Sequence, residues 1–478
     1  MKKQVKQSEY IISKKPIAEK ILNALSAKYD YASVLLTDCV GFRYGVSKSG
    51  TVISQNTSLG SKGMVIKVYH GKSYAEYSTN KIEEGMIPAI EDVIDKKLIP
   101  FVGKLPKSLH YNEYGKISDT PSELSKFGEY EIDPQELGDE KIIAKLSDLR
   151  QKTLSLDKRL LDVINMYNYQ VYHKVFLSKN RRMEQSAIWG ESYTLAMAMK
   201  EDGEVKENFQ SYSLLGGAEI LDGMEKDIEN VCKNTIELLS AEHIEPGVYD
   251  CICTPEVTGM IVHEAFGHGV EMDMFVKDRA LAKEYIGKPV ASELITMRDG
   301  NSLCDVATYF FDDEGTISND TVVIDKGILK AGISDAQSAM FLGTIPTGNG
   351  RRESYERKAY TRMTNTYFEA GKDKLSDMIA SIKYGMLLER PSSGMEDPKN
   401  WGIQCMVSSA REIKDGKFTG KIFSPIVLTG YVPDLLKSIS MVSDSVEHCG
   451  SGACGKGYKE WVKVSDGGPY IKAKICLG

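Results

Sequence analysis

The spacing of hydrophobic residues in the first half of the chain predicts alternating helices and strands. After Pro16, the apolar residues Ile17, Ile21, Leu22 and Leu25 recur at helical intervals and predict a helix with one buried face. Apolar runs predict extended segments at 31–36, 51–54 and 64–77, and helical spacing returns at 81–97 and 142–166. This mixture of elements suits a two-layer α+β domain.

A long polar stretch and a meander of strands complete this first domain. Residues 103–138 are rich in Pro, Gly, Ser, Asp and Glu, which is typical of a long surface excursion or a lid. A helix is predicted from Met224 to Leu239, and Glu245-Pro246-Gly247 marks a boundary between an N-terminal α+β domain, 1–244, and a C-terminal domain, 245–478. Strands of the meander are predicted at 169–177, 183–189, 193–199 and 205–213.

The second half is rich in short extended runs separated by turn residues. Lys326-Gly327 and Asp415-Gly416 mark two of the turns. Strands are predicted at 248–253, 306–311, 321–324, 328–333, 404–413, 417–428 and 470–476. We expect a mixed, mostly antiparallel sheet that curls in a barrel-like way around one buried helix.

Composition and charge narrow the class of protein. The chain has 478 residues, 42% of them hydrophobic and 27% charged, which is ordinary for a globular enzyme. A net charge of −7 argues against nucleic acid as the main partner. The basic start is not followed by an apolar run, and no apolar stretch approaches the roughly 18 residues of a membrane span, so neither a signal peptide nor a membrane protein is expected. Nine scattered cysteines suggest reduced thiols in the cytoplasm.

Residues 263–268, His-Glu-Ala-Phe-Gly-His, carry the clearest chemical signal. His263 and His268 are five residues apart, and on a regular α-helix they would diverge by about 140°. A local widening toward π geometry, or an end to the helix at Gly267, would bring both imidazoles to one ion. The upstream pattern predicts a short buried helix over 255–266 with Thr254 as its N-cap, and places His268 on the distorted turn that follows.

Two interpretations of this motif compete. The histidines could be hydrogen-bonded core residues, or they could hold a metal beside Glu264, whose burial would otherwise be costly. A catalytic zinc site usually takes three protein ligands, so a third must come from elsewhere. The glycine-rich stretch 447–457 offers His448, Cys449 and Cys454, and residue chemistry alone leaves the choice among them open.

The chain resembles the TldD/PmbA metallopeptidases, and among them the TldD-like branch that carries the metal motif. The resemblance rests on 246–273, FDDEG at 311–315, TGNGRR at 347–352, RMTNTY at 362–367, GACGKG at 452–457 and GGPYIK at 467–472. It implies that His263 and His268 bind the metal, that Glu264 is the catalytic glutamate and that Cys454 is a thiolate ligand. Family members often carry Gly-Gln shortly after Cys-Gly-Lys, whereas this chain continues Gly457-Tyr458-Lys459.

The resemblance also implies a reaction and a partner. Two imidazoles and one thiolate would leave zinc with an open position for water, and Glu264 would act as general base on that metal-bound water. The expected substrates are peptides or unfolded segments bound as an extended strand in the enclosed cavity of a dimer. A heterodimer with a sister subunit lacking the metal motif is the first expectation, and a homodimer the second. Rival classes are a metal-dependent hydrolase of non-peptide amides and a non-catalytic binding or regulatory protein.

Several charged residues near these motifs have two interpretations each. Glu271 and Asp273 could accept hydrogen bonds from metal-bound imidazoles, or they could be solvated or capping acids. Arg351, Arg352 and Arg362 could clamp a peptide carboxylate, but pairing with buried acids is favoured.

Overall fold

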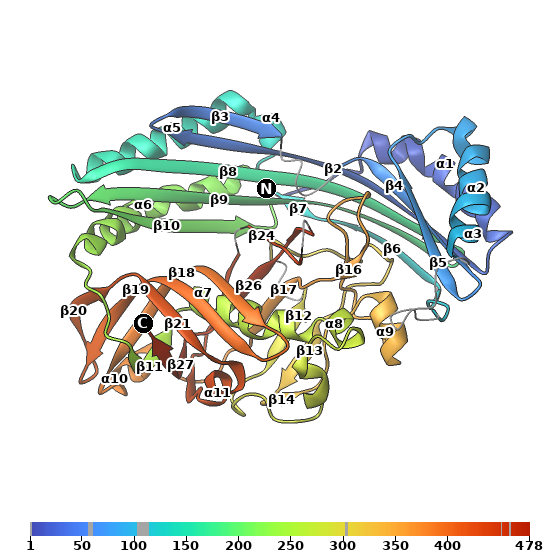
Figure 1. The fold of residues 1–478 in the computed structure, drawn as a ribbon. Helices are drawn as coiled ribbons and strands as arrows, with labels where there is room; N and C mark the ends of the chain where they lie inside the picture. Colours follow the sequence, from blue (N-terminus) through green and yellow to red (C-terminus); the bar gives the residue numbers. More distant parts are fainter. Residues whose placement is uncertain (1, 56–60, 103–113, 302–304, 451, 458–459) are drawn as a thin grey trace.

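A computed structural model describes residues 2–55, 61–102, 114–301, 305–450, 452–457 and 460–478. A long curved sheet and its helices form the upper part of the molecule in Figure 1, and a β-rich body lies beneath it. None of the described helices is both long enough and apolar enough to cross a lipid bilayer.

The upper sheet has eight strands, and three very long antiparallel strands run through its centre. They are β2 (Tyr31–Ser47), β8 (Leu160–Ser178) and β9 (Arg181–Met199). The main order is β10-β9-β8-β2-β4-β5, and β3 and β6 pair with β2 and β9. These outer strands are β3 (Gly50–Gln55), β4 (Gly63–His70), β5 (Ser73–Thr79), β6 (Ser122–Phe127) and β10 (Val205–Leu214).

Helices cover one face of this sheet at both of its ends (Figure 1). At one end, α1 (Glu9–Ser26) and α2 (Ile87–Val93) bury apolar residues against β2 and β4. At the other end, α5 (Asp139–Leu156) and α6 (Leu221–Glu237) pack on the last residues of β2 and on the middle of β8 and β9. The predicted two-layer arrangement of the N-terminal half is therefore confirmed.

Several predicted boundaries in this half are wrong, and the strands predicted at 183–189 and 193–199 form the single strand β9. Helix α1 begins at Glu9, because Ser8 caps it by accepting the N–H of Ile11 at 3.0 Å, and Pro16 lies inside the helix. The helix predicted over 142–166 ends at Leu156 in the structure. Residues 160–166, predicted as its last part, form the start of β8. The polar stretch 103–138 contains strand β6, which pairs with β9 in parallel, and residues 103–113 lie outside the described residues.

Five strands of the lower body close into a barrel, as expected. Strand β11 pairs with β18 in parallel and with β27 in the antiparallel sense, so the path β11-β18-β19-β21-β27 returns to its start. The barrel strands are β11 (Gly247–Cys253), β18 (Tyr384–Asp397), β19 (Gly402–Lys414), β21 (Ile426–Tyr431) and β27 (Ile471–Leu477). Strand β20 (Lys417–Phe423) pairs with the end of β19 in the antiparallel sense.

A second sheet of six strands lies beside the barrel, and helix α7 (Pro255–Met260) packs between the two. Gly259 permits the close approach, because a Cβ there would lie 2.4 Å from Oδ1 of Asp466. In order, the strands are β14 (Ile328–Leu329), β13 (Thr321–Asp325), β12 (Met297–Gly300), β17 (Asn365–Phe368), β26 (Ser465–Gly468) and β23 (Glu447–Cys449).

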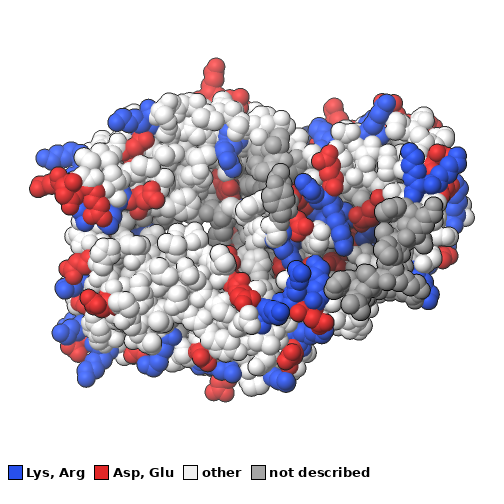
Figure 2. Space-filling model, in the orientation of Figure 1, with Lys and Arg blue, Asp and Glu red and all other residues white. Residues whose placement is uncertain are grey.

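The upper sheet rests on loops of the lower body through buried polar contacts. Nζ of Lys67 lies 2.6 Å from Glu314, and Arg352 forms a bidentate pair with Glu76 at 2.7 and 3.0 Å. The segment 306–311 is not the predicted strand, because its apolar residues pack against the upper sheet and the side chain of Gln185 accepts the N–H of Phe310. On the face seen in Figure 2, basic and acidic side chains are interspersed. The boundary at 245–247 stays a prediction.

Candidate metal centre

The helix that carries the histidine motif changes its geometry at the motif. After α7 the chain continues as a π-helix, η5 (Ile261–Gly267), and then as a short 3-10 turn, η6 (His268–Val270). The N–H of His268 bonds to the carbonyl of His263, which is the i to i+5 pattern of a π turn. The predicted widening is confirmed. Because a π turn closes after about five residues, both imidazoles emerge on one side, with ring centroids 5.1 Å apart.

Gly267 serves a different purpose from the one predicted. Its backbone is helical, with φ −58° and ψ −49°, so the helix does not end there. A Cβ at this position would lie 2.2 Å from Sδ of Met363. Glycine therefore lets the π turn pack closely against the side chain of Met363.

Strand β24 (Ala453–Cys454) brings a sulfur atom to the two imidazoles. Sγ of Cys454 lies 3.2 Å from Nε2 of His268, and one donor atom from each of His263, His268 and Cys454 lies within 4.8 Å of the others. In the described part of the chain this is the only such group of three metal-binding side chains. The other two candidates lie elsewhere, because His448 and Cys449 belong to β23 and His448 approaches Asp305 at 3.9 Å.

The donor set fits a zinc ion. Two imidazole nitrogens and one thiolate are ligands that zinc prefers, and three protein ligands leave a fourth position open. Nδ1 of His263 is buried and has no hydrogen-bond partner among the described residues, which is costly without a ligand nearby. The family resemblance and this geometry therefore point to the same three side chains, although residue chemistry alone left the third ligand open.

The three side chains also shift one another's pKa values. Burial raises the pKa of the Cys454 thiol, but the neighbouring charge and hydrogen bonds of His263 and His268 outweigh it and lower that pKa to about 5. Burial lowers the pKa of His268, but its hydrogen bonds to Cys454 and Glu271 raise it well above the usual value. The two imidazoles therefore favour the thiolate form of Cys454, which is the form that binds a metal.

Glu264 lies beside the three candidate ligands. Its Oε2 is 3.9 Å from Nε2 of His268, and burial raises the pKa of its carboxyl group. Strand β18 passes directly over it, because a Cβ on Gly394 would lie 2.6 Å from Cγ of Glu264. The carboxylate is thereby held beside the three donors without being one of them.

A buried network of charges supports His268 and Cys454. Glu271 approaches Nδ1 of His268 at 3.4 Å, Nε of Arg362 at 3.3 Å and Nζ of Lys456 at 3.0 Å. Arg362 also donates to the carbonyl of Cys454 at 2.9 Å, and Lys456 contacts Asp273. Glu271 and Asp273 are buried and paired with cations, so they are not solvated acids.

The three arginines of the sequence motifs are held by the protein itself. Arg352 pairs with Glu76 and Arg362 with Glu271, as the favoured interpretation predicts. Arg351 donates to the carbonyl of Met363 at 2.6 Å and lies 4.7 Å above the ring of Tyr309.

A cleft of about 630 Å³ opens over the candidate centre. Sequence reasoning missed three of its charged residues. Lys456 lies within the quoted GACGKG motif, but Glu396 on β18 and Asp466 on β26 stand in segments without a chemical signal. Its other lining residues include Ser392, Gly394, Met395, Pro398, Gly452, Gly455, Trp461 and Val464.

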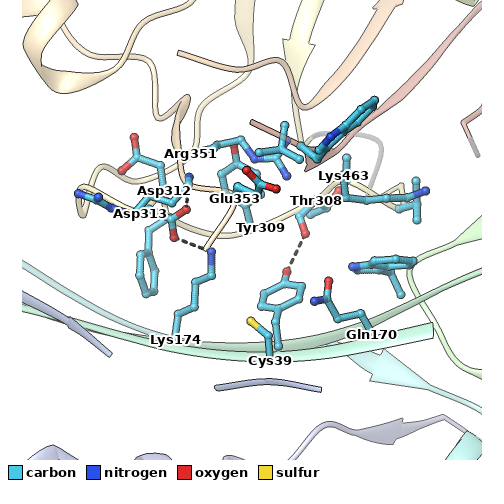
Figure 3. A pocket seen from close by; sticks show the side chains of 18 residues that line it. Cys39, Gln170, Lys174, Thr308, Tyr309, Asp312, Asp313, Arg351, Glu353 and Lys463 are labelled. Atoms are coloured by element: carbon cyan, nitrogen blue, oxygen red, sulfur yellow. Dashed lines mark hydrogen bonds and ion pairs between the residues drawn. The ribbon is translucent and has the colours of Figure 1, made fainter. Parts of the chain in front are cut away.

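A second, smaller pocket of about 70 Å³ lies between the upper sheet and the lower body (Figure 3). Two polar contacts join the halves across it, because Lys174 contacts Asp313 and the hydroxyl of Tyr172 donates to the carbonyl of Thr308 at 2.8 Å. Trp461 lines both this pocket and the cleft. The smaller pocket is therefore part of the packing between the two halves.

Comparison with known proteins places the second half in a described family. Residues 246–475 match the PmbA/TldA metallopeptidase C-terminal domain. A metalloprotease of Methanothermobacter thermautotrophicus is 29% identical, over 59% of this chain and 62% of its own length. A metalloprotease TldD homolog of Buchnera aphidicola is 36% identical over 49% of this chain and 48% of its own length. The chain thus spans about half to three fifths of these two curated relatives.

Other relatives match over most of the chain. A zinc metalloprotease TldD homolog of Saccharolobus solfataricus is 26% identical over 86% of this chain and 89% of its own length. Two crystal structures share the fold. A putative modulator of a DNA gyrase from Thermotoga maritima has a TM-score of 0.76 at 14% identity, covering 97% of this chain and 100% of its own. TldE from Thermococcus kodakarensis has a TM-score of 0.71 at 18% identity, covering 96% and 100%. The family match, the relatives and the fold agree that this chain belongs to the TldD/PmbA family of metallopeptidases.

Proposed function

We propose that the chain is a zinc-dependent peptidase that hydrolyses peptide bonds in short or unfolded peptides. The observation that carries the proposal is the meeting of His263, His268 and Cys454 within 4.8 Å, with the Glu264 carboxylate beside them. A relative named as a zinc metalloprotease supports the choice of metal.

In this proposal each side chain has a defined task. His263, His268 and Cys454 hold the ion, which supplies Lewis acidity for polarising a carbonyl group and for acidifying water. Glu264 accepts the proton of the attacking water and returns it to the leaving amine. Gly394 gives this carboxylate its space, and Glu271 orients the imidazole of His268.

We further propose that the substrate lies as an extended strand along β18. Strand β11 pairs with β18 only at Gly385–Leu388, and no described strand pairs with the same edge of β18 beyond that point. Ser392, Gly394, Met395 and Glu396 follow on this strand and line the cleft beside Glu264. A peptide that pairs with an unpaired edge gains main-chain hydrogen bonds with little side-chain preference.

We propose a second subunit as part of the working enzyme. The first choice is a heterodimer with a sister chain of the same fold that lacks the metal motif, and the second is a homodimer. The fold similarity to TldE supports the existence of such a sister chain. Light scattering of the purified chain, alone and coexpressed with a candidate sister chain, tests this. A fully active monomer would refute it.

The experiment that tests the function combines metal analysis with peptide cleavage. Wild type, Glu264→Gln and Cys454→Ser are assayed for bound zinc and for cleavage of an unstructured peptide, with an equivalent small non-peptide amide beside it. We expect Glu264→Gln to retain zinc and to lose at least about 100-fold in turnover, because it removes the general base. Cys454→Ser should lose both the bound zinc and the turnover. Undiminished cleavage by Glu264→Gln refutes the mechanism, and cleavage of the amide alone refutes the peptide substrate.

A further inference from the structure

The cleft contains a carboxyl group that the proposed reaction does not use. Glu396 stands near the end of β18, and both of its carboxylate oxygens are buried with no hydrogen-bond partner among the described residues. Burying an unpaired carboxyl group is costly, so native proteins rarely keep one without a reason. A ligand that supplies the partner of this carboxylate when it binds would be such a reason.

The backbone around Glu396 is shaped to receive its side chain. A Cβ on Gly269 would lie 2.7 Å from Oε1 of Glu396, so a larger residue at this turn would displace the carboxylate from its present position. Gly269 directly follows His268, and the carboxylate therefore lies next to the candidate centre. The carboxylate sits in a space that the chain leaves open for it.

No lysine or arginine of the described cleft lining is free to neutralise this group. Lys456 is the only such residue there, and it is already paired with Glu271 and Asp273, while the two histidines of the lining are the candidate metal ligands. The acidic residues of the lining are Glu264, Glu271, Glu396 and Asp466. Glu396 is thus available for a positive charge from outside the protein.

The position of Glu396 relates it to the scissile bond. Gly394 lies over Glu264, and Glu396 is two residues further along the same strand. At about 3.3 Å per residue, this is about 7 Å of strand length. That is the length of two peptide units, so a cation at Glu396 belongs to a residue close to the bond that is cut.

We propose that Glu396 is a specificity-determining residue that binds a primary ammonium group of the substrate, close to the scissile bond. The ammonium is either the free amino terminus of the peptide or the side chain of a lysine. The Glu396 side chain turns from Gly269 toward the cleft to meet it. This inference rests on the proposed peptidase function, and it adds a preference for cationic peptides to an otherwise sequence-tolerant strand site.

The test compares zinc-loaded wild type with Glu396→Gln on four peptides of one unstructured sequence, in the presence of the sister subunit if activity requires it. One peptide has a free amino terminus, one is N-acetylated, one is N-acetylated with a single lysine near the cleavage site, and one carries acetyl-lysine there. Glu293→Gln, at an exposed position, is the control variant. Zinc content and melting temperature are measured for every variant.

We expect Glu396→Gln to lower kcat/KM by about 10- to 100-fold for peptides that carry the bound ammonium, because a hydrogen bond to a charged group is lost. The uncharged peptides should change by less than about 2-fold, and Glu293→Gln should match wild type. If the free amino terminus is the source, the first peptide alone responds. If lysine is the source, the third peptide responds. An equal loss on all four peptides, or no loss on any, overturns the inference.

A failure of the proposed function is separable from a failure of this inference. If zinc-loaded wild type cleaves none of the peptides, binding of the same four peptides is measured by calorimetry. Tighter binding of the ammonium-bearing peptides by wild type, lost in Glu396→Gln, supports the ammonium site without the peptidase activity. Equal affinity for charged and acetylated peptides overturns it.

Discussion

Glu271→Gln is the most informative single substitution outside the three candidate ligands. Glu271 is buried, and its carboxylate lies between Nδ1 of His268, Nε of Arg362 and Nζ of Lys456. Burial alone would raise its pKa, but the charges of Lys456 and His268 outweigh burial and hold that pKa below the ordinary value. Glutamine keeps the shape of the side chain and removes the charge, so it isolates the electrostatic contribution.

Two separate effects follow from this change. The imidazole of His268 loses a charged acceptor, and the loss of such a supporting group typically weakens metal binding by 10- to 100-fold, or about 1.4 to 2.8 kcal/mol. The protein without metal loses a buried ion pair, which costs about 3 kcal/mol. We take the low end of the usual range because Lys456 keeps Asp273, and Arg362 keeps the carbonyl groups of Cys454 and Glu460.

Zinc competition with a coloured chelator measures the first effect, and urea unfolding of the apoprotein measures the second. The matched control is Lys277→Gln, which removes a half-exposed partner of Asp273 and should change stability by no more than about 1 kcal/mol. A zinc affinity of Glu271→Gln within about 2-fold of wild type would refute the argument that this carboxylate orients the metal-binding imidazole.

Three further predictions concern the surroundings of the centre. Gly394→Ala should reduce turnover by at least about 100-fold with zinc retained, because the new methyl group displaces the Glu264 carboxylate; Gly402→Ala, in open space on the adjoining strand, should be neutral in the same assay. Chelation should lower the melting temperature, and zinc at 100 times its Kd should restore about 2.7 kcal/mol; an unchanged melting temperature would contradict a folded-state site. Glu314→Gln should lower the free energy of unfolding by about 3 kcal/mol, because it leaves Lys67 buried with only Glu76; a change below about 1 kcal/mol in urea unfolding would contradict this.

The motif 263–268 was predictable to the level of local backbone geometry. Five-residue spacing excludes a shared ion on an α-helix, so the alternatives were a π turn or a helix end, and the structure has the π turn. The role of Gly267 was not predictable in the same way. Gly267 packs closely against Met363, almost a hundred residues later in the sequence. Only the tertiary structure reveals that contact.

The fold class followed from hydrophobic periodicity, whereas strand boundaries did not. The segment 306–311 is apolar enough for a strand, but its side chains pack against the upper sheet and Gln185 takes the place of a neighbouring strand. Strand β18 was missed altogether, because Arg390-Pro391 and the polar residues after it do not alternate like a half-buried strand. Alternating hydrophobic residues indicate a strand with one buried face. Strand β18 lies over the cleft, so its sequence lacks this alternation.

The residues missed in the cleft have a common physical cause. The role of Lys456 is clear from its pairing with Glu271 in the structure, whereas Glu396 stands out only because its carboxylate has no partner among the described residues. An unpaired buried carboxyl group has no sequence pattern, because its defining property is the lack of a neighbour in space. The same strand holds Gly394 over Glu264, so the proposed catalytic geometry and the proposed substrate preference both depend on the backbone of β18. A change in the register of β18 would therefore shift both together, whereas Glu396→Gln separates them.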